Sequence, residues 1–453
     1  MRDRFSNRLG FILISAGCAI GIGNVWRFPY IVGQYGGAAF VLIYLFFLVI
    51  LGLPVMVMEY SVGRASQKSA ALSFDVLEPK GTKWHFMKYV AMAGNYILMM
   101  FYTSVCGWLF YYCYKMLMGD FNGLNVGQIN NEFGLMLSNP LIQVGMMFLV
   151  VCIGFFICSK GLQNGVEKVS KYMMLCLLVL MLVLAVRSLI LPGAMEGVKF
   201  YLLPDFSKMQ NVSDVVFAAM GQAFFSMSLG MGCLSTYASY FGKETKLGNT
   251  ALSVGVIDTF VAVLAGLIIF PAAFSVGIQP DAGPSLIFIT LPNVFQQAFS
   301  GVPILAYIFS VMFYVLLALA ALTSTISLHE VVTAFLHEEF NLTRGRAARL
   351  VTFGCIIIGI ISSLSLGVMQ KYTLFDKGFF DLLDFVTAKI MLPLGGLLVC
   401  IFVGWYLKRS VSYEELTNGG KLKAGLFNLY IFLLRYVAPV AIILIFINEL
   451  GLI

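Results

Sequence analysis

Long apolar runs separated by short polar joints follow one another along almost the whole chain of 453 residues. A helix needs about 20 apolar residues to cross the hydrocarbon core of a bilayer, and each run is close to that length or longer. The pattern predicts an all-α polytopic membrane protein with about eleven transmembrane helices in one integral domain, 1–453. The expected spans are 9–32, 38–62, 88–118, 140–159, 167–191, 212–240, 252–275, 303–335, 349–369, 378–407 and 426–449. Residues 276–302 are expected to form a short helical hairpin that rests on the protein.

Composition supports this class, because 60% of the residues are hydrophobic and only 11% are charged. The net charge of +7 does not indicate nucleic acid, since lysines and arginines lie in short loops between the spans. Most of these basic residues fall on the cytoplasmic side if the N-terminus is cytoplasmic. The positive-inside rule therefore predicts that orientation in the cell membrane. We expect the lipid bilayer and a small molecule as partners, and the sequence indicates no obligate protein partner.

Two predicted spans are interrupted at matching positions. The first contains AIGIGN at 19–24, and the sixth contains SMSLGMG at 226–232. Lipid cannot hydrogen-bond a freed backbone, so an unwound segment at membrane depth must be buried in protein or line a polar cavity. Matching breaks in two halves of a chain indicate a transporter binding site. Glycines that only allow close helix packing are the alternative; the pairing of the breaks, with hydroxyl and amide side chains beside them, favours a binding site.

Four longer motifs carry a family resemblance: NVWRFPY at 24–30, MEYSVGR at 58–64, GQAFFSMSLGMG at 221–232 and ALTSTIS at 321–327. With these motifs the chain resembles the bacterial amino-acid transporter branch of the neurotransmitter:sodium symporter family, and the resemblance extends over essentially the whole chain. The resemblance implies a LeuT-type fold with unwound helices 1 and 6. In that fold spans 1–5, about 9–191, and spans 6–10, about 212–407, are inverted repeats, followed by an additional helix at about 426–449. It also implies a sodium-coupled symporter that imports neutral hydrophobic or aromatic L-amino acids by alternating access.

The resemblance places the substrate at the two breaks. A zwitterion in a dry site needs both charges compensated. Free N–H groups in the first break would bind the carboxylate, with the positive end of a helix dipole behind them, and freed carbonyls would face the ammonium. The implied substrate contacts are Ala19, Ile22, Gly23, Leu98, Tyr102, Phe225, Ser226, Ser228, Met231, Ser324 and Leu328. Their walls are apolar without fixed charge, and the flexible Met231 makes room for a bulky side chain such as that of tyrosine or tryptophan.

Two sodium sites are implied, because transporters of this fold bind the ion with unwound carbonyls and short oxygen-bearing side chains. Site one would use Ala19, Asn24, Ser226, Asp258 and the substrate carboxylate. Site two would use Gly17, Ile20, Ala320, Thr323 and Ser324. The two hydroxyls of site two have an alternative use, which is to bond back to their own helix.

Asp258 is a carboxylate inside span 7, where it costs about 2.5–3.5 kcal/mol at the bilayer centre and therefore needs a partner. Sodium is the expected partner, and an ion pair with Lys389 in span 10 is the alternative. Chloride-dependent relatives have a serine where this chain has Ala262. The resemblance thus implies that the charge of Asp258 replaces chloride, so that no chloride is needed. Protonation of Asp258 on the return step would add proton antiport.

The resemblance also implies two gates and one structural acid. Arg27, one turn beyond the first break, matches the arginine that pairs across the outer vestibule with an acid of span 10, here Asp384. Arg2 and Glu338 match the pair of the cytoplasmic gate. Glu59, within MEYSVGR, is expected to hydrogen-bond the unwound backbone of spans 1 and 6.

Three other functions compete with this prediction. A membrane enzyme is disfavoured because the three histidines lie near predicted cytoplasmic ends, away from the breaks, and no zinc motif is present. A channel is disfavoured because no repeated pore-loop motif is visible. A proton-coupled transporter of the same fold is the nearest alternative, and Thr323 and Ser324 beside Ala320 favour sodium over protons.

Overall fold

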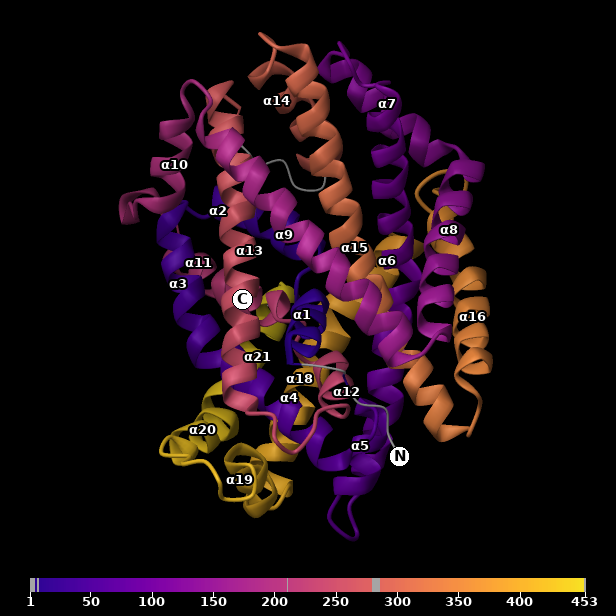
Figure 1. Cartoon of the computed structure of the whole chain (residues 1–453), viewed down its shortest axis with the longest axis vertical. Helices are drawn as coiled ribbons and strands as arrows, with labels where there is room; N and C mark the ends of the chain where they lie inside the picture. Colours follow the sequence, from indigo (N-terminus) through magenta and orange to yellow (C-terminus); the bar gives the residue numbers. More distant parts are fainter. Residues whose placement is uncertain (1–4, 6–7, 210, 279–285, 452–453) are drawn as a thin grey trace.

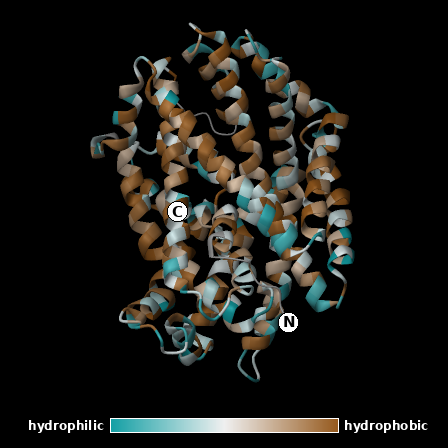
Figure 2. Cartoon of the chain, viewed as in Figure 1, coloured by the Kyte–Doolittle hydropathy of each residue, from teal (hydrophilic) through white to brown (hydrophobic). Residues whose placement is uncertain are grey.

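The computed structural model describes the chain except residues 1–4, 6–7, 210, 279–285 and 452–453. Figure 1 shows a bundle of long helices, with α7, α10 and α14 at one end and α5, α19 and α20 at the other. Apolar residues cover most of the length of the long helices in Figure 2. Many of them are exposed, such as Leu141, Phe156 and Val179. A lipid environment accounts for this surface, because water would make it unfavourable.

The first half of the described chain contains α1 (Arg8–Ala19), η1 (Gly23–Arg27), α2 (Phe28–Gln34), α3 (Ala38–Phe47), η2 (Leu48–Gly52), α4 (Leu53–Ser66), α5 (Ala70–Leu77), η3 (Trp84–Phe86), α6 (Met87–Met118), α7 (Val126–Ser138), α8 (Pro140–Ser159), η4 (Leu162–Glu167), α9 (Lys168–Leu189), α10 (Ala194–Leu202) and η5 (Phe206–Lys208). The second half contains α11 (Val212–Ser226), α12 (Cys233–Ala238), α13 (Leu247–Ser275), η6 (Leu286–Thr290), α14 (Leu291–Ala298), α15 (Pro303–Glu339), α16 (Arg344–Leu364), β1 (Thr373–Leu374), β2 (Lys377–Gly378), α17 (Phe379–Asp384), η7 (Phe385–Met391), α18 (Leu392–Ile401), η8 (Phe402–Tyr406), α19 (Arg409–Thr417), α20 (Phe427–Phe432), η9 (Leu433–Val437) and α21 (Ala438–Glu449). The strands β1 and β2 form one antiparallel pair.

Within the described residues, nine helical segments are long and apolar enough to cross a membrane. A tenth span is the bent pair of α1 with η1 and α2, whose two parts meet at 56°. The predicted span 212–240 is found as α11 and α12, separated by residues 227–232. The predicted fold class, an all-α membrane protein with interrupted helices 1 and 6, is confirmed.

Several spans contain a wider π turn just before a proline, as at Pro29, Pro54 and Pro393. Proline has no N–H, and its ring clashes with the carbonyl four residues earlier. A π turn relieves that conflict without ending the helix. The hydropathy pattern does not reveal these turns, because they leave the apolar run unbroken.

The segment between spans 7 and 8 rests on the protein, as the sequence predicts. Its described part is η6 followed by α14, which packs against α13 and α15. Leu286, Leu291 and Phe295 are fully buried there.

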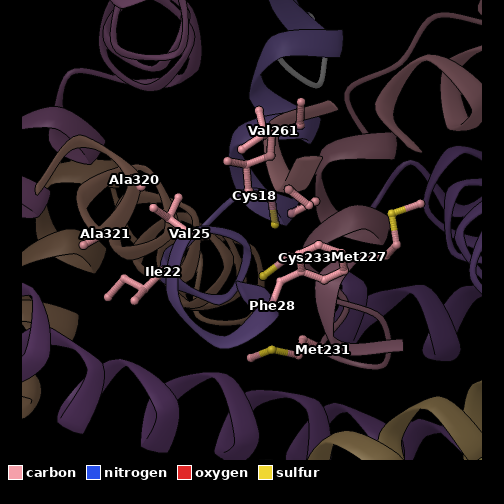
Figure 3. Close-up of a cluster of buried hydrophobic side chains, with 14 of the residues drawn as sticks. Cys18, Ile22, Val25, Phe28, Met227, Met231, Cys233, Val261, Ala320 and Ala321 are labelled. Atoms are coloured by element: carbon pink, nitrogen blue, oxygen red, sulfur yellow. The ribbon is translucent and has the colours of Figure 1, made fainter. Parts of the chain in front are cut away.

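The centre of the bundle is where the two interrupted spans meet. Figure 3 shows buried side chains from both, with Cys18, Ile22 and Val25 of span 1 in one cluster with Met231 and Cys233 of span 6. Ala320 and Ala321 of α15 belong to the same cluster.

Candidate substrate and sodium site

The break in span 6 is held open by its backbone. Ser228, Gly230 and Gly232 all have positive φ, at 51°, 83° and 73°, which a right-handed helix does not allow. A Cβ atom on Gly230 would lie 2.5 Å from the carbonyl oxygen of Leu392. Glycine is therefore required at this position both for its conformation and for its close contact with α18.

Hydrogen bonds fix the two breaks. The hydroxyl of Ser228 donates to the carbonyl of Cys18 at 3.0 Å and so joins span 6 to span 1. The Gly230 N–H donates to Glu59 Oε1 at 2.6 Å, and Glu59 is 1% exposed. Within the described residues Glu59 Oε1 accepts this one hydrogen bond from span 6, and Oε2 has no hydrogen-bond partner. The predicted hydrogen bond from Glu59 to the break in span 6 is therefore found, and one to the break in span 1 is not.

The residues predicted for sodium site one converge on Asp258. Asn24 Nδ2 donates to Asp258 Oδ1 at 2.7 Å, and Ser226 Oγ donates to Oδ2 at 2.5 Å. All three side chains are buried, and Asp258 has no exposed surface. Within the described part of the chain no lysine, arginine or histidine forms an ion pair with Asp258. The arrangement is a buried carboxylate with neutral donors around it, which needs a cation or a proton to balance its charge.

Four of the five residues predicted for sodium site two, namely Gly17, Ala320, Thr323 and Ser324, also lie together. A Cβ atom on Gly17 would lie 3.7 Å from Thr323 Cβ, so the end of α1 faces this turn of α15. Thr323 Oγ1 and Ser324 Oγ both donate to the Ala320 carbonyl, at 2.9 and 3.4 Å. The two hydroxyls thus hydrogen-bond to the backbone of their own helix, which is the alternative that the sequence analysis left open. These bonds hold three predicted oxygen ligands within one turn of helix.

A cavity of about 550 Å³ lies between the breaks. Its walls include every predicted substrate contact, namely Ala19, Ile22, Gly23, Leu98, Tyr102, Phe225, Ser226, Ser228, Met231, Ser324 and Leu328. The volume lies within the range of about 300–1,000 Å³ that small-molecule sites occupy. The cavity continues toward the α7 and α14 end of the bundle, where residues that the sequence analysis did not single out line it: Trp108, Phe133, Phe288 and Phe380.

Two hydroxyl groups face the break in span 1. A Cβ atom on Gly21 would lie 2.6 Å from Ser324 Oγ and 3.3 Å from the Tyr102 hydroxyl. A glycine at 21 therefore leaves room for these groups beside the free backbone of the break, where a carboxylate could accept hydrogen bonds from both.

Arg27, which the resemblance places in the outer gate, has a partner that the sequence did not suggest. Arg27 Nη2 lies 3.7 Å from Glu449 Oε1 of α21, and its guanidinium lies 4.5 Å from the centre of the Phe225 ring. Asp384, the predicted partner, lines the same cavity.

Lys389 Nζ lies 3.5 Å from Glu449 Oε2. The alternative in which Lys389 neutralises Asp258 is therefore wrong, because this lysine is held by the end of the last span.

The opposite end of the bundle is filled with aromatic rings. The ring of Phe5 lies 5.8 to 6.3 Å from those of Phe11, Tyr237, Tyr240 and Phe241. These rings form one cluster at this end of the bundle. Of the predicted cytoplasmic gate pair, Arg2 lies outside the described residues, and Glu338 Oε2 accepts a hydrogen bond of 2.9 Å from the Ser69 N–H.

Two interrupted helices around a cavity in the middle of a membrane bundle define a secondary transporter. The family model described as the Sodium:neurotransmitter symporter family matches residues 2–133 and 131–452, and the chain belongs to this family. It is a sodium-dependent symporter and a multi-pass membrane protein, not an enzyme.

Known sodium-dependent transporters are similar to this chain over nearly its full length. The chain is 35% identical to an uncharacterized sodium-dependent transporter, YhdH, of Bacillus subtilis (strain 168), over 99% of this chain and 98% of the relative. It is 34% identical to an uncharacterized sodium-dependent transporter of Haemophilus influenzae, with the same coverage. Among solved structures, MhsT in complex with L-phenylalanine matches with a TM-score of 0.87 and 36% identity, covering 99% of this chain and 100% of that one.

Proposed function

We propose that this symporter imports neutral hydrophobic or aromatic L-amino acids together with sodium, by alternating access and without chloride. The observation that carries the proposal is the cavity between the breaks, which all eleven predicted substrate contacts line. The similarity to MhsT, solved with L-phenylalanine, supports the substrate class.

The cavity offers a suitable partner for each part of such a substrate. Free N–H groups at Ile22 and Gly23, with the Tyr102 hydroxyl, suit the carboxylate. The carbonyls of Ala19 and Phe225 suit the ammonium. Leu98, Met231 and Leu328 form apolar walls for the side chain. A charged side chain would find no compensating charge among these walls, so a neutral amino acid fits best.

We propose two sodium ions and no chloride, which the oxygen groups and the buried charge around the breaks support. Site one would consist of Ala19, Asn24, Ser226 and Asp258 with the substrate carboxylate, and site two of Gly17, Ile20, Ala320, Thr323 and Ser324. The buried Asp258 supplies the negative charge that a chloride ion would otherwise bring, and an anion bound beside it would be repelled. Ala262 has no hydroxyl to hold such an anion.

The orientation completes the proposal. With the N-terminus in the cytoplasm of the cell, the cavity opens outward and the aromatic rings around Phe5 close the inner path. Binding of substrate and sodium would bring Arg27 to Asp384 over Phe225 and Tyr102 and close the outer path. The cytoplasmic gate, for which we propose Arg2 and Glu338, would then open to release the substrate.

Uptake of labelled L-phenylalanine into vesicles that contain the purified protein tests this proposal. We expect accumulation with a sodium gradient and none with equal sodium on both sides, and we expect no change when gluconate replaces chloride. Among the twenty amino acids, large neutral ones should compete best. Tyr102→Phe, which removes one hydroxyl and keeps the ring, should weaken substrate binding about tenfold, equivalent to one hydrogen bond to a charged group. Uptake driven by a proton gradient without sodium would establish the proton-coupled alternative.

A further inference from the structure

Glu449 connects the last span to the outer gate. It ends α21, and its carboxylate lies between two cations, Arg27 of span 1 at 3.7 Å and Lys389 of span 10 at 3.5 Å. Lys389 Nζ also donates to the backbone carbonyl of Glu449 at 3.0 Å. A lysine at the carboxyl end of a helix is favourable because it faces the negative end of the helix dipole. Lys389 therefore fixes the position of Glu449, whose carboxylate reaches Arg27.

Arg27 has acids on two sides of the cavity mouth. Glu449 holds it from span 11, whereas Asp384 lines the cavity from α17 of span 10. Phe225 lies under the guanidinium at 4.5 Å. The arginine side chain is 38% exposed and lines the cavity. In this open arrangement its ion pair is with Glu449.

We propose that the Glu449 carboxylate is a second ion-pair partner of Arg27, and that this ion pair stabilises the outward-open state. When the outer path closes, Arg27 leaves Glu449 and pairs with Asp384 instead. The inference rests on the proposed function and adds the last span to the gating machinery. Glu449 is a positioning residue, because it acts on the substrate only through Arg27. Its charge lowers the free energy of the open state and so opposes the closure that retains the substrate.

Substrate binding to the full chain tests this exchange, because affinity and dissociation rate both report closure. The assay is equilibrium and pulse-chase binding of labelled L-phenylalanine in sodium. Glu449→Gln removes the charge and keeps both the shape and the backbone carbonyl that Lys389 caps. We expect tighter binding and slower dissociation, each by about two- to fivefold, the range for one half-exposed ion pair. Glu449→Asp, whose shorter side chain reaches Arg27 less well, should change both quantities in the same direction by less.

Two controls separate this effect from a structural one. Glu414→Gln, on the exposed face of α19, should bind as the wild type does. In a protein that already carries Asp384→Asn, Glu449→Gln should no longer strengthen L-phenylalanine binding, since Arg27 then has no second carboxylate to pair with. Unchanged or weaker binding in Glu449→Gln, or a gain that persists without Asp384, would overturn the inference. Failure of the wild-type protein to bind L-phenylalanine in sodium would instead refute the proposed function.

Discussion

Replacing Asp258 by asparagine removes the buried charge while nearly preserving the shape of the side chain. In the native site the carboxylate accepts hydrogen bonds from Asn24 at 2.7 Å and from Ser226 at 2.5 Å, with no exposed surface. An unbalanced carboxylate at the bilayer centre costs about 2.5–3.5 kcal/mol. Sodium relieves that cost when it binds, so the charge contributes about this much to sodium affinity. Since about 1.4 kcal/mol is a factor of ten, Asp258→Asn should weaken sodium binding about 70- to 400-fold.

Thermal unfolding of the purified protein measures this directly, without relying on uptake. Sodium at 100 times its dissociation constant stabilises the wild type by about 2.7 kcal/mol. That value is for one site; at the same concentration site one of the variant should contribute only about 0.1–0.5 kcal/mol, by the same relation, while site two should contribute as it does in the wild type. Without sodium, the variant should unfold at a higher temperature than the wild type, because its buried charge is gone.

The matched control is Asp376→Asn, an exposed acid in the turn between β1 and β2, which should keep the full sodium response. Sodium stabilisation of equal size in Asp258→Asn and in the wild type would refute the reasoning, because the ion would then be held without this carboxylate.

Three further substitutions test other parts of the site. Gly230→Ala should destabilise the protein by at least about 1–2 kcal/mol, the cost of a left-handed residue, since its Cβ would also press on the Leu392 carbonyl; thermal unfolding measures this. Glu59→Ala removes the acceptor of the Gly230 N–H, so chemical unfolding should show a loss of about 1–3 kcal/mol, the cost of leaving a buried donor unsatisfied. Met231→Phe should weaken competition by tryptophan more than competition by leucine in the uptake assay, because a rigid ring narrows the cavity.

The sequence predicts the membrane fold closely because a bilayer imposes a simple rule on chain composition. Helices must be apolar over a fixed length, so the predicted span 303–335 lies within α15, Pro303–Glu339. The breaks were also predictable, because clustered glycine and polar residues disfavour a lipid-facing helix. The helical path is broken at residues 20–22 and 227–232, within the predicted segments.

The partners of charged side chains were less predictable. The sequence left Lys389 open as the alternative partner of Asp258, and the family resemblance implied Asp384 as the partner of Arg27. The structure pairs both cations with Glu449, which is more than 400 residues from Arg27 along the chain. Such ion pairs depend on which helices pack side by side, and a local sequence pattern does not predict which spans are neighbours.

The central claim is that the ion and the substrate share the site between the two breaks. Coupled binding of sodium and L-phenylalanine tests this claim most directly. Equilibrium binding should be measured for each ligand at several concentrations of the other. The account predicts that saturating sodium strengthens L-phenylalanine binding by some factor and that saturating L-phenylalanine strengthens sodium binding by the same factor. L-phenylalanine affinity that does not change with sodium concentration would contradict it.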